Sequence, residues 1–179
     1  MPGTTNPQLR PGTPDDLPQL TALYNHYVTQ TPVTFDTVAF SPEQRQTWLS
    51  HYADHGPHRL LVAEETGGED GGEGGGRLLG YATSSPFRPK PAYATSVETT
   101  VYVAPGAGGR GVGTLLYEGL FAALAGEDVH RAYAGVTLPN EASVRLHERF
   151  GFRRCGVFGQ TGRKFGRYWD VAFYEKPLG

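Results

Sequence analysis

The residues best suited to chemistry lie in one stretch, from Glu98 to Leu120, which combines a lone carboxylate with a run of glycines. Thr99 to Val103 are β-branched or aromatic at every position, and Pro105 ends this predicted strand because proline cannot donate to a ladder. Five glycines follow between Gly106 and Gly113, and apolar residues then recur at helical spacing. Backbone N–H groups at such a helix start lie where the helix dipole is positive, so the stretch predicts a phosphate cradle.

The residues alone leave three interpretations of this glycine loop open. Gly106, Gly108 and Gly111 satisfy the G-x-G-x-x-G dinucleotide fingerprint, but a Rossmann unit carries it in its first strand–helix–strand unit, with an acid about 20 residues later. Here the fingerprint begins only at residue 106, and no Lys-Ser or Lys-Thr pair follows it as in a nucleotide P-loop. A turn without a ligand is the third interpretation, although ordering five glycines costs conformational entropy.

Two segments resemble the acetyl-CoA-binding motif of the GCN5-related N-acetyltransferase (GNAT) superfamily, Val101-Tyr102-Val103-Ala104-Pro105 and Gly109-Arg110-Gly111-Val112-Gly113. The resemblance implies that the loop binds the pyrophosphate of coenzyme A and that the strand pairs with its pantetheine arm. The residues that it assigns to the cofactor are Val101, Tyr102, Val103, Gly108, Gly109, Arg110, Gly111, Val112, Gly113, Thr114, Asn140 and Ser143. The chain departs from the family at Gly108, where Gln or Arg is usual, and the missing side chain predicts a weaker grip on the diphosphate.

The composition is that of one globular domain with little net charge. A chain of 179 residues can bury about 70% of its unfolded surface. Sixteen basic and eighteen acidic side chains give a net charge of −2, which predicts no general attraction to nucleic acid or to an anionic membrane. The lone Cys155 cannot form an internal disulfide, and neither a signal peptide nor a membrane span is evident, so we expect a cytoplasmic protein.

Capping residues and hydrophobic periodicity predict the elements that must position this stretch. Helices are expected to begin after Thr13 and after Ser41, each with proline at its first position. Another helix should follow the glycine loop, and a fourth should run from Asn140 to Phe150, with Gly151 just beyond its end. Strands are expected at 9–11, 59–65, 78–84, 94–103, 132–138, 152–158 and 170–176, the last two flanking a loop at 159–168.

The domain prediction is a loose tail at 1–8 followed by a single domain at 9–177. The segment 67–76 holds seven glycines and three acids, which predicts a flexible hairpin loop with no fold of its own.

Outside the glycine loop, the residues alone leave the candidate side chains undecided. Glu98 is equally an edge charge or a base, and His147 shares the inward stripe of its helix, where a hydrogen-bonded core histidine is commoner than a catalyst. The run from Pro86 to Tyr93 places Arg88 and Lys90 among three prolines, either as a solvated turn or as a clamp for an anion. Phe35, in a loop between helices, is equally a core residue or a ligand contact.

Taken together, segments from residue 9 to residue 176 resemble the phosphinothricin acetyltransferase branch of the superfamily. The matching segments are Tyr24 to Tyr27, Val33 to Phe35, Pro86 to Tyr93, Glu98 to Val103, Leu138 to Asn140, Ser143 to Glu148 and Gly166 to Phe173. The resemblance implies that Glu98 is the general base, that His147 is a second catalytic group, and that Phe35, Arg88, Lys90 and Tyr93 lie near the acceptor. It also implies a homodimer and an α/β (α+β) GNAT fold, with a splayed mixed sheet of six to seven strands and about four helices.

These residue types suit direct acetyl transfer to an amine. A carboxylate such as Glu98 can remove the proton of an ammonium, backbone N–H groups near Tyr102 and Val103 can stabilise an oxyanion, and His147 can neutralise a departing thiolate. The histidines and acids show no metal-ligand spacing, so no metal is expected.

The sequence therefore predicts an acetyl-CoA-dependent N-acetyltransferase acting on the α-amine of a small amino-acid-like acceptor, such as phosphinothricin or methionine sulfoximine. One alternative is another amine, a polyamine or a protein N-terminus, although the cations Arg88 and Lys90 would repel a polyamine. A second alternative is a coenzyme A-binding module without turnover, and a Rossmann reductase is a distant fourth interpretation.

Overall fold

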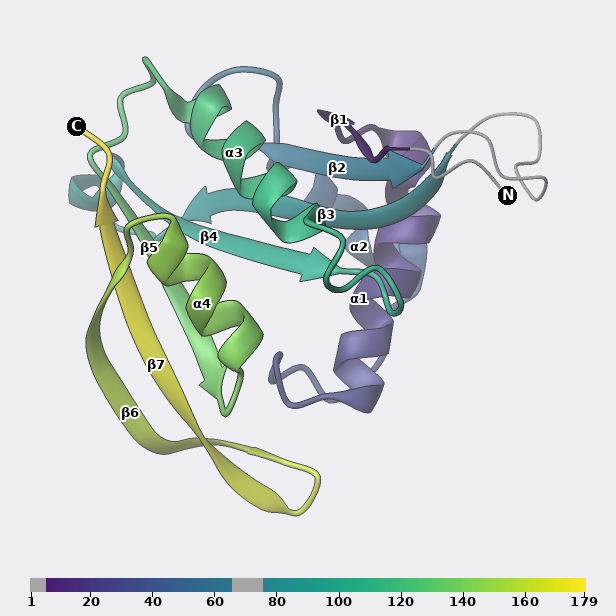
Figure 1. Cartoon of the computed structure of the whole chain (residues 1–179), viewed down its shortest axis with the longest axis vertical. Helices are drawn as coiled ribbons and strands as arrows, with labels where there is room; N and C mark the ends of the chain where they lie inside the picture. The colour runs from purple at the N-terminus through teal and green to yellow at the C-terminus, as the bar shows by residue number, and fades with distance from the viewer. Residues whose placement is uncertain (1–5, 66–75) are drawn as a thin grey trace.

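The computed structural model describes residues 6–65 and 76–179, so the predictions for residues 1–5 and for nearly all of the 67–76 loop lie outside the described residues. One mixed sheet of seven strands, in the order β1-β2-β3-β4-β5-β7-β6, carries four α-helices (Figure 1). This confirms the expected fold class. The strands are β1 (Gln8–Pro11), β2 (Leu60–Glu65), β3 (Arg77–Pro86), β4 (Ser96–Val103), β5 (Arg131–Leu138), β6 (Arg153–Lys164) and β7 (Arg167–Pro177).

The helices expected after Ser41 and Asn140 begin at those caps, whereas the helix expected after Thr13 begins with a 3₁₀ turn and becomes α-helical at Leu17. The α-helices are α1 (Leu17–Gln30), α2 (Pro42–Leu49), α3 (Val112–Leu124) and α4 (Glu141–Arg149), with short 3₁₀ turns at Pro14–Asp16 and Pro91–Tyr93. The Ser41 hydroxyl accepts from the Gln44 N–H, and the Gln44 side chain accepts from the Ser41 N–H, which completes a capping box. Gly151 follows α4 with φ of +79°, the left-handed conformation expected after a helix end. No helix in the described part of the chain has the length and apolar character to cross a membrane.

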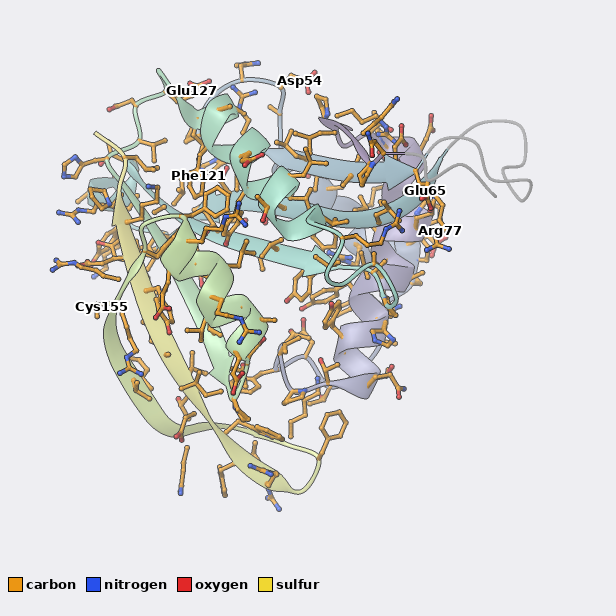
Figure 2. All side chains as sticks on the ribbon, viewed as in Figure 1. Asp54, Glu65, Arg77, Phe121, Glu127 and Cys155 are labelled. Carbon is orange, nitrogen blue, oxygen red and sulfur yellow. The ribbon has the colours of Figure 1, made fainter. Side chains whose placement is uncertain are left out.

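The helices cover both faces of the sheet, with α3 and α4 on one face and α1 and α2 on the other (Figure 1). The larger core cluster lies between the sheet and α3, around Leu116 and Leu120. Figure 2 shows Phe121 on α3, and its ring centroid lies 5.8 Å from that of Phe150 at the end of α4. Along β4, Thr99 contacts Tyr117 of α3, whereas Tyr102 packs on the α1 side. Because side chains alternate along a strand, Glu98 faces the same side as Tyr102.

The sheet opens at its centre, between its only parallel pair of described strands. Only Ser96–Glu98 of β4 pair with β5, where their partners are Arg131–Tyr133. Beyond these residues the two strands diverge (Figure 1). The remainder of β4, from Thr99 to Val103, therefore has no strand partner on its β5 side. This gap is the central splay that the sequence resemblance implies.

The predicted loop at 159–168 is wrong, because β6 and β7 continue through it as a long hairpin. Only Phe165 and Gly166 form the turn, with φ of +52° and +73°, the left-handed pair that matches the twist of a two-residue hairpin. A register irregularity between Phe158 and Gly162 bends β6. Glycines and cations dominate this segment of the sequence, so it shows no alternation of apolar and polar residues from which strands could be predicted.

Gly80 should be intolerant of any side chain, because a Cβ there would lie 2.6 Å from the backbone oxygen of Tyr102 and 3.1 Å from Leu116. Overpacking at a strand pair cannot be relieved by a side-chain rotation, so Gly80→Ala should lower the free energy of unfolding by about 1–3 kcal/mol in urea denaturation.

The matched control is Gly108→Ala, where a Cβ would meet no atom within 4 Å, and its free energy of unfolding should change by less than about 0.5 kcal/mol. Equal stabilities of the two variants would contradict the packing described for β3 and β4.

Candidate active site

A cavity of about 810 Å³ lies where β4 and β5 diverge, and the glycine loop and the starts of α3 and α4 complete its walls. Of the residues that the sequence assigns to the cofactor, the cavity is lined by Val101, Tyr102, Val103, Gly108, Gly109, Gly111, Val112, Gly113, Thr114, Asn140 and Ser143. The structure thus brings together residues from three separate segments of the chain.

The glycine loop presents backbone rather than side chains to this cavity. Gly106, Gly109 and Gly111 have φ between +76° and +81°, and Gly111 is the N-cap of α3. These left-handed conformations turn the chain so that N–H groups at the start of α3 point out of the loop, where the helix dipole favours an anion. A Cβ built at Gly108 meets no atom within 4 Å, so the missing Gln or Arg leaves open space.

The free edge of β4 offers the cavity a second set of backbone groups. The Phe87 N–H donates to Ser96 O, and the Ala104 N–H donates to Leu79 O, so the even-numbered residues of β4 bond toward β3. Backbone groups alternate in direction along a strand, so those of Val101 and Val103 point toward the gap. The sequence predicts that N–H groups near Tyr102 and Val103 stabilise the oxyanion. The hydrogen-bond register favours the N–H groups of the odd-numbered residues, Val101 and Val103, for this role.

Arg110 is the one predicted cofactor residue that does not line the cavity. Its guanidinium forms an ion pair of 2.6 Å with Glu65 at the end of β2. The side chain therefore ties the loop to the neighbouring strand.

His147 lies on the wall of the same cavity but is almost fully buried. Its Nδ1 lies 2.7 Å from Ser143 O and its Nε2 lies 2.8 Å from the Tyr117 hydroxyl, which in turn lies 3.2 Å from the Thr99 hydroxyl. A carbonyl can only accept, so Nδ1 carries the proton and Nε2 accepts from Tyr117. Burial lowers the pKa of His147, and the bond to Ser143 partly opposes the shift. The imidazole is accordingly neutral at pH 7.

Glu98 stands where β4 and β5 separate, on the side of the sheet that faces α1 and α2. Its carboxylate reaches over β5, where a Cβ built on Gly135 would lie 3.9 Å from Oε1. Burial raises the pKa of Glu98 above its ordinary value of 4.5, and the positive charge of Arg88 partly opposes the shift. Glu98 itself lines no cavity, but its neighbour Thr99 and the facing Gly135 line the 810 Å³ cavity, and a half-buried carboxylate of raised pKa so placed suits a general base.

Three of the four predicted acceptor residues lie on the exposed turn between β3 and β4, and of these Arg88 acts electrostatically on Glu98. Arg88 is exposed, with its guanidinium carbon 4.4 Å from the centroid of the Phe87 ring, and Phe87 stacks on Tyr133 of β5 at 4.2 Å. Lys90 is exposed, and Tyr93 is half-exposed with its ring 5.8 Å from Phe87. The structure therefore brings Arg88 and Tyr93 together around one aromatic residue, Phe87, that the sequence analysis did not single out.

Phe35 belongs to the loop between α1 and α2, which the tip of the β6–β7 hairpin holds in place. Phe35 packs so closely on Gly162 that a Cβ there would lie within about 2.1 Å of its ring. The buried Lys164 ammonium donates to Thr34 O at 2.7 Å. No sequence signal links residues 34 and 164, which are 130 positions apart.

Tyr27 and Tyr117 are also residues that sequence reasoning missed as site residues. The Tyr27 hydroxyl donates to Val103 O at 2.5 Å, so α1 holds the end of β4 beside the cavity. Tyr117 bridges Thr99 and His147. Each lies on the inward side of its helix, which predicts burial but gives no partner.

A sheet that opens beside a glycine-rich helix start, with a half-buried carboxylate on the adjoining face, suits an enzyme that binds a phosphate-bearing ligand and moves a proton. Residues 20–152 match the family model described as "Acetyltransferase (GNAT) family", so the chain belongs to the GNAT family of N-acetyltransferases. In residues 6–65 and 76–179, no three His, Cys, Asp or Glu side chains are grouped to hold a metal.

The chain is similar to characterised acetyltransferases over its whole length. It is 64% identical to a phosphinothricin N-acetyltransferase of Streptomyces coelicolor, over 99% of this chain and 100% of that protein. It is 33% identical to an L-methionine sulfoximine/L-methionine sulfone acetyltransferase of Pseudomonas paraeruginosa, over 91% and 90% of the two chains. A phosphinothricin acetyltransferase from Sinorhizobium meliloti, solved in complex with acetyl-CoA, superposes with a TM-score of 0.84 at 29% identity, over 97% of this chain and 89% of that one.

The buried contacts of His147 predict how stability depends on pH. The unfolded chain binds a proton at the ordinary histidine pKa of 6.5, whereas the folded protein resists it, so stability should fall as pH drops below 6.5 toward the lowered pKa. His147→Gln should weaken this acid-side dependence, part of which His58 retains because burial lowers its pKa too, and through its lost hydrogen bonds it should lower the free energy of unfolding at pH 7 by about 1–3 kcal/mol.

Urea denaturation between pH 5 and pH 8 (about the range in which histidine titrates) measures both effects. Tyr117→Phe removes the hydrogen bonds of the Tyr117 hydroxyl to Thr99 and His147 but keeps the imidazole, so it should retain the acid-side dependence. A His147→Gln protein with the stability and pH profile of the wild type would contradict the hydrogen-bond chain.

Proposed function

We propose that this protein transfers the acetyl group of acetyl-CoA to the α-amine of a small amino-acid-like acceptor of the phosphinothricin or methionine sulfoximine type. The observation that carries the proposal is Glu98, a half-buried carboxylate of raised pKa at the point where β4 and β5 separate. The named substrates of relatives at 64% and 33% identity support this class of acceptor.

The residues of the cavity suit coenzyme A. Exposed N–H groups at the start of α3 suit its pyrophosphate, and the unpaired edge of β4 suits the amides of its pantetheine arm. Open space beside the glycines admits a close approach to the backbone. When bound, acetyl-CoA supplies the acetyl group as a thioester.

Glu98 acts as the general base. An amine acceptor arrives mainly as an ammonium, which cannot attack a carbonyl until it loses a proton. The Glu98 carboxylate takes this proton, directly or through one water, and its raised pKa brings its basicity closer to neutral pH.

Two further groups assist the transfer. The N–H groups of Val101 and Val103, which point toward the gap, donate to the oxygen that becomes negative on the acetyl carbon. His147 is the second catalytic group: with the Tyr117 hydroxyl that it holds, it supplies a proton near the departing thiolate. Because His147 is neutral at pH 7, it first takes up on Nε2 the proton that the acceptor nitrogen loses after its attack and then returns it to the thiolate, while the Nδ1 proton stays bonded to Ser143 O.

The acceptor binds on the side of Glu98 that is away from the cofactor. The residues that bind it are Phe35, Arg88, Lys90 and Tyr93. Arg88 acts electrostatically on Glu98, so a carboxylate on the α-carbon of the acceptor can contact Arg88 while the amine contacts Glu98.

The family resemblance further predicts a homodimer. It is supported by β6, the outer strand of the sheet, which exposes Val157 and Phe158. A cytoplasmic location stays a prediction from the sequence.

Thiol release from acetyl-CoA tests the function against a panel of phosphinothricin, methionine sulfoximine, natural amino acids, spermidine and a short peptide. Fast release with the first two, and slow release with the others, is the expected result. Release only with spermidine or the peptide would assign another amine as the acceptor and remove the anion-binding role of Arg88 and Lys90. Binding of acetyl-CoA without release for any amine would contradict the proposal as a whole.

Glu98→Gln should lower kcat/KM about 10²–10⁴-fold at neutral pH, since the carboxamide cannot accept the proton. The wild-type rate should fall on the acid side, as pH drops through the raised pKa of Glu98. The deficit of the variant should shrink at high pH, where the acceptor is already a free amine. The control is Glu118→Gln, an exposed position on α3, which should behave as wild type. Full turnover by Glu98→Gln at neutral pH would remove Glu98 as the base.

A further inference from the structure

A second, smaller cavity of about 250 Å³ lies on the α1–α2 side of the sheet, and the proposed mechanism does not use it. Its walls come from α1, from the following loop, from α2 and from the middle of β3 and β4. They are rich in hydroxyl groups, which belong to Tyr24, Tyr52, Tyr81, Tyr102, Thr83, Ser85 and Thr100. A cavity of this size, lined by polar groups, is suited to a small polar ligand.

The cavity contains a buried cation, Arg45, whose side chain and backbone are only 5% exposed. Its guanidinium carbon lies 3.8 Å from the centroid of the Trp48 ring and 4.4 Å from that of Tyr24, and Nη1 donates to Leu20 O at 3.0 Å. The guanidinium also interacts with the Tyr81 hydroxyl, and since it carries five N–H groups, it keeps further donors for a ligand. Among the described residues no carboxylate lies within 4.0 Å of it. A buried charge without a counter-ion is costly, and an anionic ligand would offset that cost.

The other charge at the cavity, Asp36, is occupied elsewhere. Its carboxylate accepts a hydrogen bond from the Tyr24 hydroxyl and interacts electrostatically with the buried Lys164. Burial raises the pKa of Tyr24 to about 12, so its hydroxyl stays protonated and donates. At the cavity itself Arg45 accompanies one carboxylate, Asp36, whose charge Lys164 partly balances from outside the cavity.

The position of the cavity relative to Glu98 matches the length of the acceptor. Ser85 lies at the cavity and pairs with Glu98 in register, and Thr100 follows Glu98 on the same face of β4. Residues two apart on a strand are about 7 Å apart. In phosphinothricin and in methionine sulfone the tetrahedral phosphorus or sulfur is four bonds from the α-amine, a comparable reach. An amine at Glu98 therefore brings the far end of the same molecule to this cavity.

We infer that Arg45 and the surrounding hydroxyl groups bind the oxygen atoms of a tetrahedral phosphinate, sulfone or sulfoximine group at the far end of the acceptor. This inference rests on the proposed function, and it adds a specificity-determining subsite to it. A site built to donate hydrogen bonds rejects an analogue without acceptor oxygens much more strongly than an apolar pocket rejects a missing methylene. The subsite selects phosphinothricin and methionine sulfone over methionine, which has the same chain without the oxygens.

The test compares kcat/KM of wild type and Arg45→Met for three acceptors: phosphinothricin, methionine sulfone and methionine. The variant should lose about 100-fold or more with phosphinothricin, since a charged ligand loses its counter-ion, and about tenfold with the sulfone. Methionine should change less than about twofold, because it makes no hydrogen bond there. Arg153→Met, which removes an exposed cation of β6, is the matched control and should change none of the three. An equal loss with all three acceptors would show that Arg45 only holds α1 and α2 together, and would overturn the inference.

Thr100→Val provides the same comparison if Arg45→Met fails to fold, because it removes one cavity hydroxyl at nearly constant volume. A selective loss with phosphinothricin and the sulfone supports the subsite, and an unselective loss or no loss overturns it. If the wild type acetylates none of these acceptors, the proposed function fails. Calorimetric titration of phosphinothricin then tests the subsite without turnover. Binding that weakens in Thr100→Val supports the subsite, and equal binding, or none, overturns it.

Discussion

The short parallel pairing of β4 with β5 is the constraint on which the site depends. Three residues of each strand are in register, and the separation that follows leaves one edge of β4 unpaired inside the molecule. Unpaired backbone groups are costly when buried, so a fold that keeps such an edge must fill it with a ligand or expose it to water. The Tyr27 hydroxyl satisfies Val103 O at one end. The rest of the edge lies in the 810 Å³ cavity, which is where an extended chain of amides can pair with it. In the proposed function, the gap thus provides both the cofactor site and the place of reaction.

On each face of the sheet, the elements beside the gap are fixed by contacts between segments that are distant in sequence. On the α3–α4 side, the chain of Thr99, Tyr117 and His147 links β4, α3 and α4 through buried hydrogen bonds. On the α1–α2 side, Lys164 at the hairpin tip fixes the backbone of the loop that carries Phe35. Buried polar networks of this kind specify one arrangement, because every alternative leaves a donor or acceptor unpaired. The same contacts that stabilise the fold therefore also fix the geometry of the site.

Local patterns were sufficient to predict the parts of this structure that depend on neighbouring residues. The Ser41 capping box, the Asn140 cap and the glycine loop are each encoded within a few positions, and the structure has them as predicted. The hairpin at 159–168 was predicted wrongly, because its strand pairing is set by tertiary context and by a two-residue turn. Nothing in the sequence indicates that Arg45 is buried, since an arginine on a polar helix normally faces water. It turns inward only because Tyr24, from another helix, joins Trp48 around it.

The two halves of the site differ in how closely they depend on side-chain identity. The cofactor half consists mainly of backbone groups, from the glycine loop and from the free edge of β4, so the absence of a side chain at Gly108 leaves its donors in place. The proposed acceptor half consists of side chains from the α1–α2 loop, from α2, from β3 and β4, and from the hairpin tip. A substitution there alters a specific contact. Lys164, at the hairpin tip, lines neither cavity, but its hydrogen bond to Thr34 O makes the α1–α2 loop depend on it as well. Relatives that share one cofactor can therefore diverge in acceptor by changing only the second half, because the two sets of contacts meet only along β4.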